Sequence, residues 1–141
     1  MIKHEIRYYQ SRCDRIKGTN YTEVREKAWA IYRDIDIQTG GRNTYVRSAY
    51  FKKEKVFLKT YWNHLYDLVL GQRIKRMPYY AATIDLLKNS HVEPEVFYRM
   101  REKYYRFYGI TRDKHEFVVQ VKENKKGEKF HMSSFPPGHK N

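Results

Sequence analysis

The spacing of apolar side chains predicts an α-helix near the beginning of the chain. These residues recur at intervals of three and four positions, at Val24, Ala28, Ile31 and Ile35. Such spacing places them on one face of a helix. Thr22, with glutamates in the turn that follows, suits the helix N-terminus, and Gly40 ends the run. The polar residues 1–20 before this helix are expected to form a short helix or an extended arm.

The middle of the chain alternates between strand and helix patterns. Period-two alternation predicts a strand over residues 42–51, followed by a turn over 52–55. Apolar residues at helical spacing then predict a helix over 56–70 that stops at Gly71, and a short helix that begins near residue 81 and ends at 89–90.

Strand patterns dominate the last third of the chain. Aromatic residues favour a strand over 103–110, and the segment FVVQVK at 117–122 is the clearest strand in the sequence. Asn124 to Gly127 is a strong hairpin turn, and a final strand follows at 129–135. Helices followed by consecutive strands predict an α+β fold, with N-terminal helices packed on an antiparallel β-meander of four or five strands. We expect a single domain over residues 1–141, ending in a tail at 138–141.

The final hairpin sets which side chains share a face of the sheet. A loop over 124–127 pairs Lys122 with Lys129 and Gln120 with His131. Alternation then gives one polar face and one core face. The polar face carries Gln120, Lys122, His131 and Ser133, and the core face carries Val119, Val121, Phe130 and Met132. The same register puts Arg106 opposite Val121 on the core face, unless a bulge at Gly109 reverses it.

The polar face of this hairpin has the functional groups that RNA cleavage requires. The reaction needs a base for the 2′-hydroxyl, cations for the negative charge of the phosphorane and an acid for the 5′-oxygen, but no metal. The alternative is a merely solvated face of a half-exposed sheet. His64, on the helical stripe of residues 56–70, is either a partly buried structural histidine or a general base. Arg73, Lys75 and Arg76 form a basic cluster that serves as a phosphate grip or is simply solvated.

Charge and aromatic content favour a nucleic-acid partner. Lys and Arg number 29 against 16 acidic residues, a formal net charge of +13, and the chain has 14 tyrosines. Cations neutralise phosphates while aromatic faces stack on unpaired bases, so RNA is the expected ligand.

Other classes of chemistry find no support in the sequence. No GxxxxGK[ST] or GxGxxG loop is present, and the six histidines are scattered without metal-ligand spacing, so we expect no cofactor and no metal. The one cysteine, Cys13, cannot form an internal disulfide, and no apolar run suits a signal peptide or membrane span. These features predict a cytoplasmic protein.

Three C-terminal segments resemble a known nuclease family. The order RFYGIT, FVVQVKENKKG and HMSSFPP is similar to the terminal β-meander of the barnase–EndoU–colicin–RelE-like nucleases, in their phage-associated branch. The resemblance covers residues 42–137, taken as a nuclease-like core. It implies a metal-independent, toxin-like endoribonuclease that cleaves RNA by attack of the 2′-hydroxyl on the adjacent phosphate. An antitoxin or immunity protein would be its partner.

The resemblance also suggests site residues. Carried over onto this chain, these are His64, Arg106, Gln120, Lys122 and Ser133 or Ser134. Two other classes of function remain open. One is a non-catalytic RNA- or DNA-binding module, and the other is a phage accessory protein that binds a host factor.

Overall fold

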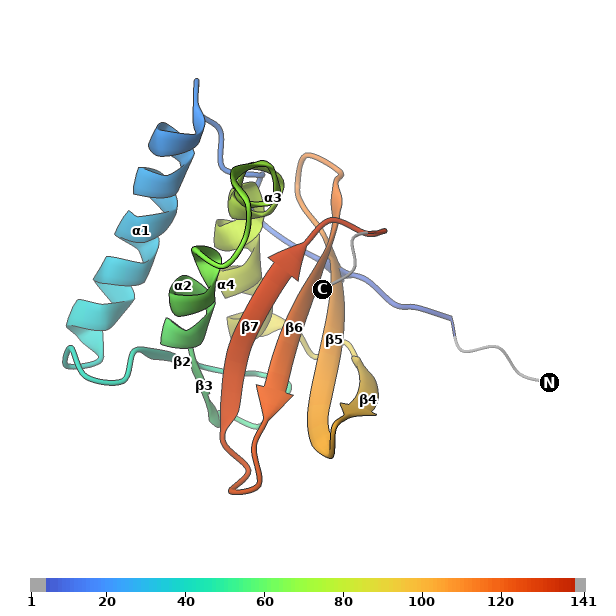
Figure 1. Ribbon diagram of the computed structural model, residues 1–141. Helices are drawn as coiled ribbons and strands as arrows, with labels where there is room; N and C mark the ends of the chain where they lie inside the picture. The colour runs from blue at the N-terminus through green and yellow to red at the C-terminus, as the bar shows by residue number, and fades with distance from the viewer. Residues whose placement is uncertain (1–4, 139–141) are drawn as a thin grey trace.

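The computed structural model describes residues 5–138, which form four α-helices and a seven-stranded sheet (Figure 1). The helices are α1 (Tyr21–Gln38), α2 (Lys59–Leu65), α3 (Leu70–Arg76) and α4 (Tyr80–Asn89), and a 3-10 turn, Met77–Tyr79, joins α3 to α4. The strands are β1 (Tyr9–Gln10), β2 (Tyr45–Arg47), β3 (Lys55–Phe57), β4 (Glu95–Arg99), β5 (Glu102–Ile110), β6 (Glu116–Glu123) and β7 (Lys129–Phe135).

The sheet is mixed and runs in the order β1-β5-β6-β7-β3-β2, with β4 on the same edge of β5 as β1. Strands β4 to β7 form an antiparallel meander, whereas β1 runs parallel to β5 and β3 parallel to β7. The expected combination of helices and a β-sheet is confirmed. The prediction of a wholly antiparallel sheet of four or five strands is wrong, because short segments from the first half of the chain extend both edges.

The predicted elements between residues 42 and 76 differ from those observed. Only Tyr45–Arg47 of the predicted strand is a strand, and β3 begins at Lys55 inside the predicted turn. The helix predicted over 56–70 is wrong at its start, because Val56 and Phe57 pair with β7 before α2 begins. Gly71 lies inside α3 rather than ending a helix.

The first helix, α1, has the predicted apolar face, but its N-cap differs from the predicted one. The Asn20 side chain accepts a hydrogen bond from the Glu23 backbone N–H at 2.9 Å, so Asn20 rather than Thr22 is the N-cap. Residues 5–20 form an extended arm, which the Ser11 hydroxyl fixes by donating to Asp85 at 2.8 Å. Residues 1–4 and 139–141, at the ends of the predicted arm and tail, lie outside the described part.

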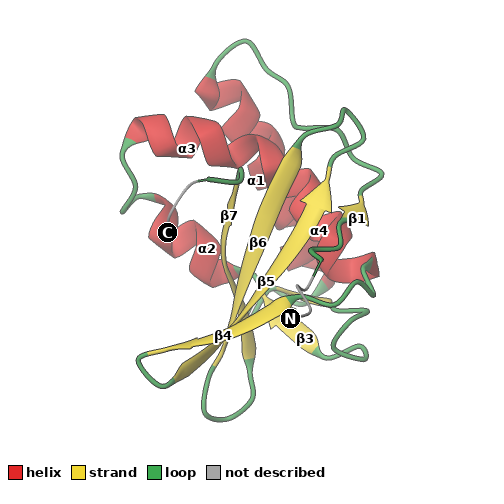
Figure 2. Ribbon diagram, turned by 90° about the vertical axis from the view of Figure 1, so that its right-hand side faces the viewer, coloured by secondary structure: helices red, strands yellow, loops and turns green. Residues whose placement is uncertain are grey.

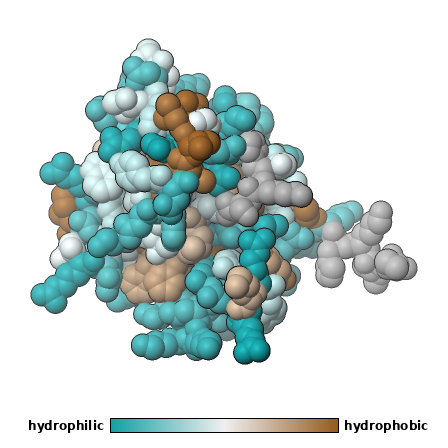
Figure 3. All heavy atoms as spheres, viewed as in Figure 1, coloured by the Kyte–Doolittle hydropathy of each residue, from teal (hydrophilic) through white to brown (hydrophobic). Residues whose placement is uncertain are grey.

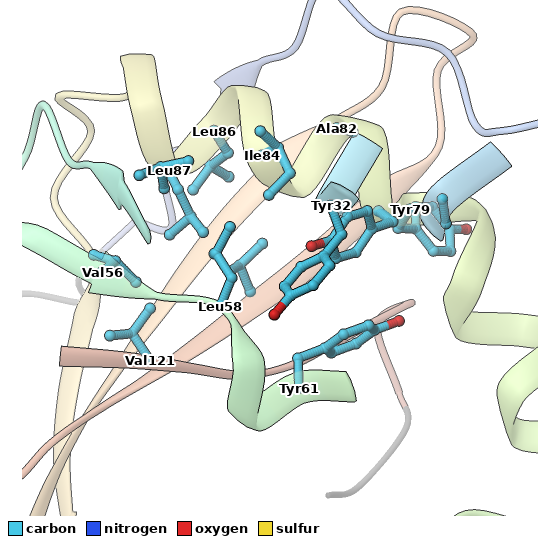
Figure 4. Packing of buried hydrophobic residues seen from close by; sticks show 14 of the residues in the cluster. Tyr32, Val56, Leu58, Tyr61, Tyr79, Ala82, Ile84, Leu86, Leu87 and Val121 are labelled. Carbon is cyan, nitrogen blue, oxygen red and sulfur yellow. The ribbon is translucent and has the colours of Figure 1, made fainter. Parts of the chain in front are cut away.

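The core lies between the helices and one face of the sheet, which we call the inner face and define by Phe107, Val119 and Val121. Figure 4 shows how Leu58 and several tyrosines pack there. The indole N–H of Trp62 donates to the Tyr80 hydroxyl at 3.1 Å, so that a buried tyrosine is satisfied within the core. We call the opposite face, with Arg106, Gln120 and Lys122, the outer face. Figure 2 shows α2 and α3 on the β7 side of the sheet, where both helices contact β7.

The final hairpin has a register one residue away from the predicted one. Glu123 pairs with Lys129, because the Asn124 side chain closes a loop that includes Glu128 by accepting from its backbone N–H at 2.9 Å. Lys122 therefore faces Phe130, and Val121 faces His131. A one-residue shift sends every following side chain to the other face. A bulge then interrupts the pairing, so that Gln120 faces Ser133.

Candidate functional site

A pocket of about 210 Å³ lies between the α2–α3 segment and the outer face of the sheet. Its lining comprises Tyr61, His64, Leu65, Leu68, Arg76, Tyr104, Gln120, Met132 and Ser133. Four of these residues were predicted from the sequence as site candidates: Gln120 and Ser133 together on one face of the sheet, and His64 and Arg76 separately. The fold brings them around one cavity.

The sheet side of the pocket includes Gln120 on β6 and Ser133 on β7, and Arg106 on β5 is the direct neighbour of Gln120. Arg106 pairs with Gln120 and Gln120 with Ser133, so the three side chains share the outer face. The Arg106 Nε–H donates to Gln120 Oε1 at 3.3 Å. The predicted pairing of Arg106 with Val121 is wrong. Pairing runs without interruption from Ile110–Glu116 to Lys103–Glu123, so no bulge at Gly109 is involved.

The helix side of the pocket carries a histidine–aspartate pair. His64, in the last turn of α2, has its Nδ1 at 3.1 Å from Oδ2 of Asp67. The His64 side chain is 55% exposed, so it is a half-exposed surface group rather than a buried structural one. When Nδ1 donates to the carboxylate, Nε2 carries no proton and is free to accept one as a base.

The basic cluster on α3 divides between the pocket and the surface. Arg76 lines the pocket at only 4% exposure, and its guanidinium lies 5.4 Å from the centre of the Phe135 ring. Burial lowers the pKa of Arg76 despite a smaller opposing effect of Tyr61, but an arginine keeps its charge in proteins. Arg73 instead donates to the Leu68 carbonyl at 2.9 Å, and Lys75 is exposed; neither lines the pocket.

Two predicted site residues lie in the core instead. His131 is fully buried on the inner face, where its ring stacks on Tyr61 with centroids 4.7 Å apart. Its Nε2 lies 2.8 Å from the Ser134 hydroxyl oxygen, which accepts from Thr83 at 2.7 Å. Burial lowers the pKa of His131 to about 3, against a smaller opposing effect of a hydrogen bond with the Ser133 backbone. The prediction that His131 shares the polar face is wrong because of the shifted register.

Lys122 lies on the outer face next to the pocket but does not line it. Its ammonium forms an ion pair with Glu102 at 2.5 Å, and it stands between Tyr104 on β5 and Phe130 on β7. The prediction that Gln120, Lys122 and Ser133 share a face is therefore confirmed. The Lys122 ammonium, however, lies next to the cavity and not in its lining.

Sequence reasoning missed several contributors to the pocket. Asp67 follows His64 at the three-residue spacing that lets helix side chains meet, and this signal was available. Tyr104, Leu68 and Met132 reach the pocket only through tertiary packing and the bulge, and no local pattern indicates them.

The pocket suits an anionic ligand. None of the described residues that line it is a carboxylate, whereas Arg76 lines it and Arg106 is hydrogen-bonded to its wall. Within residues 5–138, no group of three or more His, Cys, Asp and Glu side chains is arranged to hold a metal ion. In the same part of the chain, none of the helices has both the length and the apolar character that crossing a membrane requires.

Comparison with known proteins gives no relative: no protein-family model, no curated protein and no solved structure matches the chain significantly. The resemblance to the nuclease family therefore stays a prediction, and the function has to be argued from the pocket itself.

Proposed function

We propose that the pocket is the active site of a metal-independent endoribonuclease. The observation that carries this proposal is the placement of His64 and Arg76 around one cavity, with Asp67 paired to His64 and Arg106 hydrogen-bonded to Gln120 of the cavity wall. Cleavage through the 2′-hydroxyl needs a general base and cations that stabilise the negative charge. The described lining contains both kinds of group and no carboxylate.

His64 is the proposed general base. Asp67 holds its Nδ1, which leaves Nε2 to take the proton of the ribose 2′-hydroxyl. The 2′-oxygen then attacks the adjacent phosphorus, and the bond from phosphorus to the 5′-oxygen breaks. The leaving 5′-oxygen receives a proton from the imidazolium or from water. The products are a 2′,3′-cyclic phosphate and a 5′-hydroxyl.

The arginines stabilise the charge that develops on the phosphorane. Arg76 is buried against the pocket wall, and Arg106 is oriented by the Gln120 carbonyl oxygen. Cations held in a partly dry site act more strongly than cations in water, and they need no rearrangement during the reaction. Gln120 is thus a positioning residue for Arg106.

Incubation of the protein with RNA in the presence of EDTA tests this proposal. We expect fragments that end in a 2′,3′-cyclic phosphate or a 3′-phosphate. His64→Ala should lower the rate by a factor on the order of 10²–10⁴, the usual contribution of a general base. His91→Ala is the matched control, since His91 is exposed in the loop before β4. Fragments with 3′-hydroxyl ends, or loss of activity with EDTA, would contradict the mechanism.

A non-catalytic RNA-binding module is the second candidate, and partly exposed aromatic side chains on the outer face favour it. Binding of RNA without cleavage under all conditions tested would select this alternative. A toxin-like role with an antitoxin or immunity protein as partner rests on the sequence resemblance alone, and we propose it only as an extension of the nuclease.

A further inference from the structure

A row of side chains crosses the outer face of the sheet from one edge to the other. Each residue is the direct partner of the next in the strand pairing, so all of them point to the same side. In order from β2 to β4 the row comprises Tyr45, Phe57, Phe130, Lys122, Tyr104 and Phe97. We call this set the aromatic row.

The rings of the aromatic row lie close together and remain accessible. Phe97 and Tyr104 are stacked with centroids 5.3 Å apart and planes at 12°, and Phe57 and Phe130 have centroids 5.6 Å apart. All six residues are partly exposed. Figure 3, which views this side of the molecule, shows apolar side chains among hydrophilic ones over β3 and the lower part of β7. Because the core is on the inner face, the row does not belong to it.

Cations stand over both ends of the aromatic row and at its centre. The guanidinium of Arg106 lies 4.6 Å from the Phe97 ring centre, and the Lys55 ammonium lies 4.5 Å from the Tyr45 ring centre. Arg47 is also placed over Tyr45, at 5.5 Å. Lys122 supplies the central charge.

Carboxylates also occur on this face, but most are engaged. Glu102 pairs with Lys122, and Glu95 accepts a hydrogen bond from the Tyr108 hydroxyl. Glu128 lies beside Phe130 and accepts from the Asn124 amide at 2.9 Å. The four cations named above outnumber these three carboxylates, in keeping with a net charge of +13 for the chain.

We propose that the aromatic row binds single-stranded RNA, with unpaired bases against the rings and phosphates near the interleaved cations. Aromatic faces accept any unpaired base, and cations neutralise the backbone, whereas paired bases in a duplex are not free to stack on a protein surface. Five intervals between neighbouring strands span about 24 Å. This is room for several nucleotides, within the site sizes of about 4–16 that sheet-based binding modules show.

The aromatic row leads to the pocket. Tyr104 belongs to the row and also lines the pocket, and Lys122 is two residues from Gln120 on the same face of β6. A strand bound along the row would therefore present a phosphate to His64 and Arg76. The identity of the nucleic acid as RNA rests on the proposed function, and the row adds that the substrate is single-stranded.

Binding of a non-cleavable RNA tests the row separately from catalysis. The probe is a fluorescently labelled 2′-O-methyl RNA of about twelve nucleotides, which lacks the attacking hydroxyl. We expect Phe57→Leu and Phe97→Leu each to weaken binding about fivefold or more, the lower end of the effect of losing one stacked base. Tyr98→Leu is the matched control: this tyrosine is 70% exposed on the same strand as Phe97 but on its other side.

The duplex of the same sequence should bind more weakly to the parent protein. Equal affinity for strand and duplex would overturn the proposal, because it would reduce binding to charge alone. Unchanged affinity of Phe57→Leu and Phe97→Leu for the RNA probe, with unfolding curves like the parent's, would also overturn the proposal. A protein partner would then be the alternative ligand of the aromatic row. Since the probe cannot be cleaved through its 2′ position, intact cleavage with failed row binding refutes only the row, and the reverse refutes only the nuclease.

Discussion

The buried imidazole of His131 is expected to make the free energy of unfolding fall as the pH is lowered from about 7 to 5. Burial lowers the pKa of His131 to about 3 in the folded state, whereas an exposed histidine in the unfolded chain has a pKa of about 6.5. Between these two values the unfolded state binds a proton that the folded state does not. The stability is therefore fully present above the unfolded pKa and is lost as the pH falls below it.

The size of this effect follows from the two pKa values. Each pH unit below about 6.5 removes about 1.4 kcal/mol, so the change from pH 7 to 5 costs about 2 kcal/mol. That is a large share of the free energy of unfolding of a typical protein, which is about 5–15 kcal/mol. The window also avoids the carboxylates. Burial alone would raise the pKa of Asp113, but hydrogen bonds from Thr111 and Arg15 lower it, and its contribution is lost only below about pH 4.

Urea unfolding of the parent protein and of His131→Gln at both pH values measures the effect. The variant lacks the titrating ring but keeps a polar group near Ser134, so it should be less stable at pH 7 and show a smaller loss on acidification, by about 2 kcal/mol. The exposed His91→Gln should behave like the parent. An equal loss of unfolding free energy in the parent and in His131→Gln would refute the reasoning. It would mean that the His131 ring does not stay uncharged in the folded protein.

Three further expectations concern packing, the pocket and charge. A Cβ at Gly109 would lie 2.6 Å from the Phe117 ring, so Gly109→Ala should lower the stability by about 1–3 kcal/mol. Gly71 lies in α3, and a Cβ there would meet no atom within 4 Å, so Gly71→Ala should stabilise the protein by about 0.5–1 kcal/mol. Thermal unfolding measures both effects. Arg106→Ala should lower the rate of RNA cleavage by a factor on the order of 10²–10³, because Arg106 is hydrogen-bonded to Gln120 of the pocket wall. Lys75→Ala, at an exposed position of α3, should leave the single-turnover rate unchanged. Affinity for single-stranded RNA should fall steeply with salt, with a log–log slope of about 0.7 per neutralised phosphate, and a flat response in a titration would contradict the electrostatic argument.

Elements with enough residues to show their period were predictable from the sequence. The helix α1 repeats its apolar positions over about three turns, from Val24 to Ile35, and β5 to β7 are long enough for alternation to be visible. The strands β1, β2 and β3 have two or three residues each and owe their existence to a partner strand. The parallel pairing of β1 with β5 and of β3 with β7 decides that the sheet is mixed, and no local pattern carries that information.

The candidate site was predictable as far as the hairpin register was known. Alternation alone correctly groups Gln120 with Lys122, because both lie on one uninterrupted strand. It fails for His131, because the register depends on whether Glu128 joins the loop, a choice made by hydrogen bonds to the Asn124 side chain. Ser133 was placed on the correct face although the register was wrong by one, since the bulge before it compensates for the shift.

The bulge has a consequence for how the pocket and the core share β7. Without it, strict alternation would place His131 and Ser133 on the same face, and one of the two would be misplaced. With Met132 as the extra residue, His131 stacks on Tyr61 in the core while Ser133 and Met132 both reach the pocket. One strand thus supplies a buried polar pair to the inner face and two pocket residues to the outer face. Bulges that redirect side chains next to a site are features of the fold rather than defects, which supports placing the chemistry at this point of the sheet.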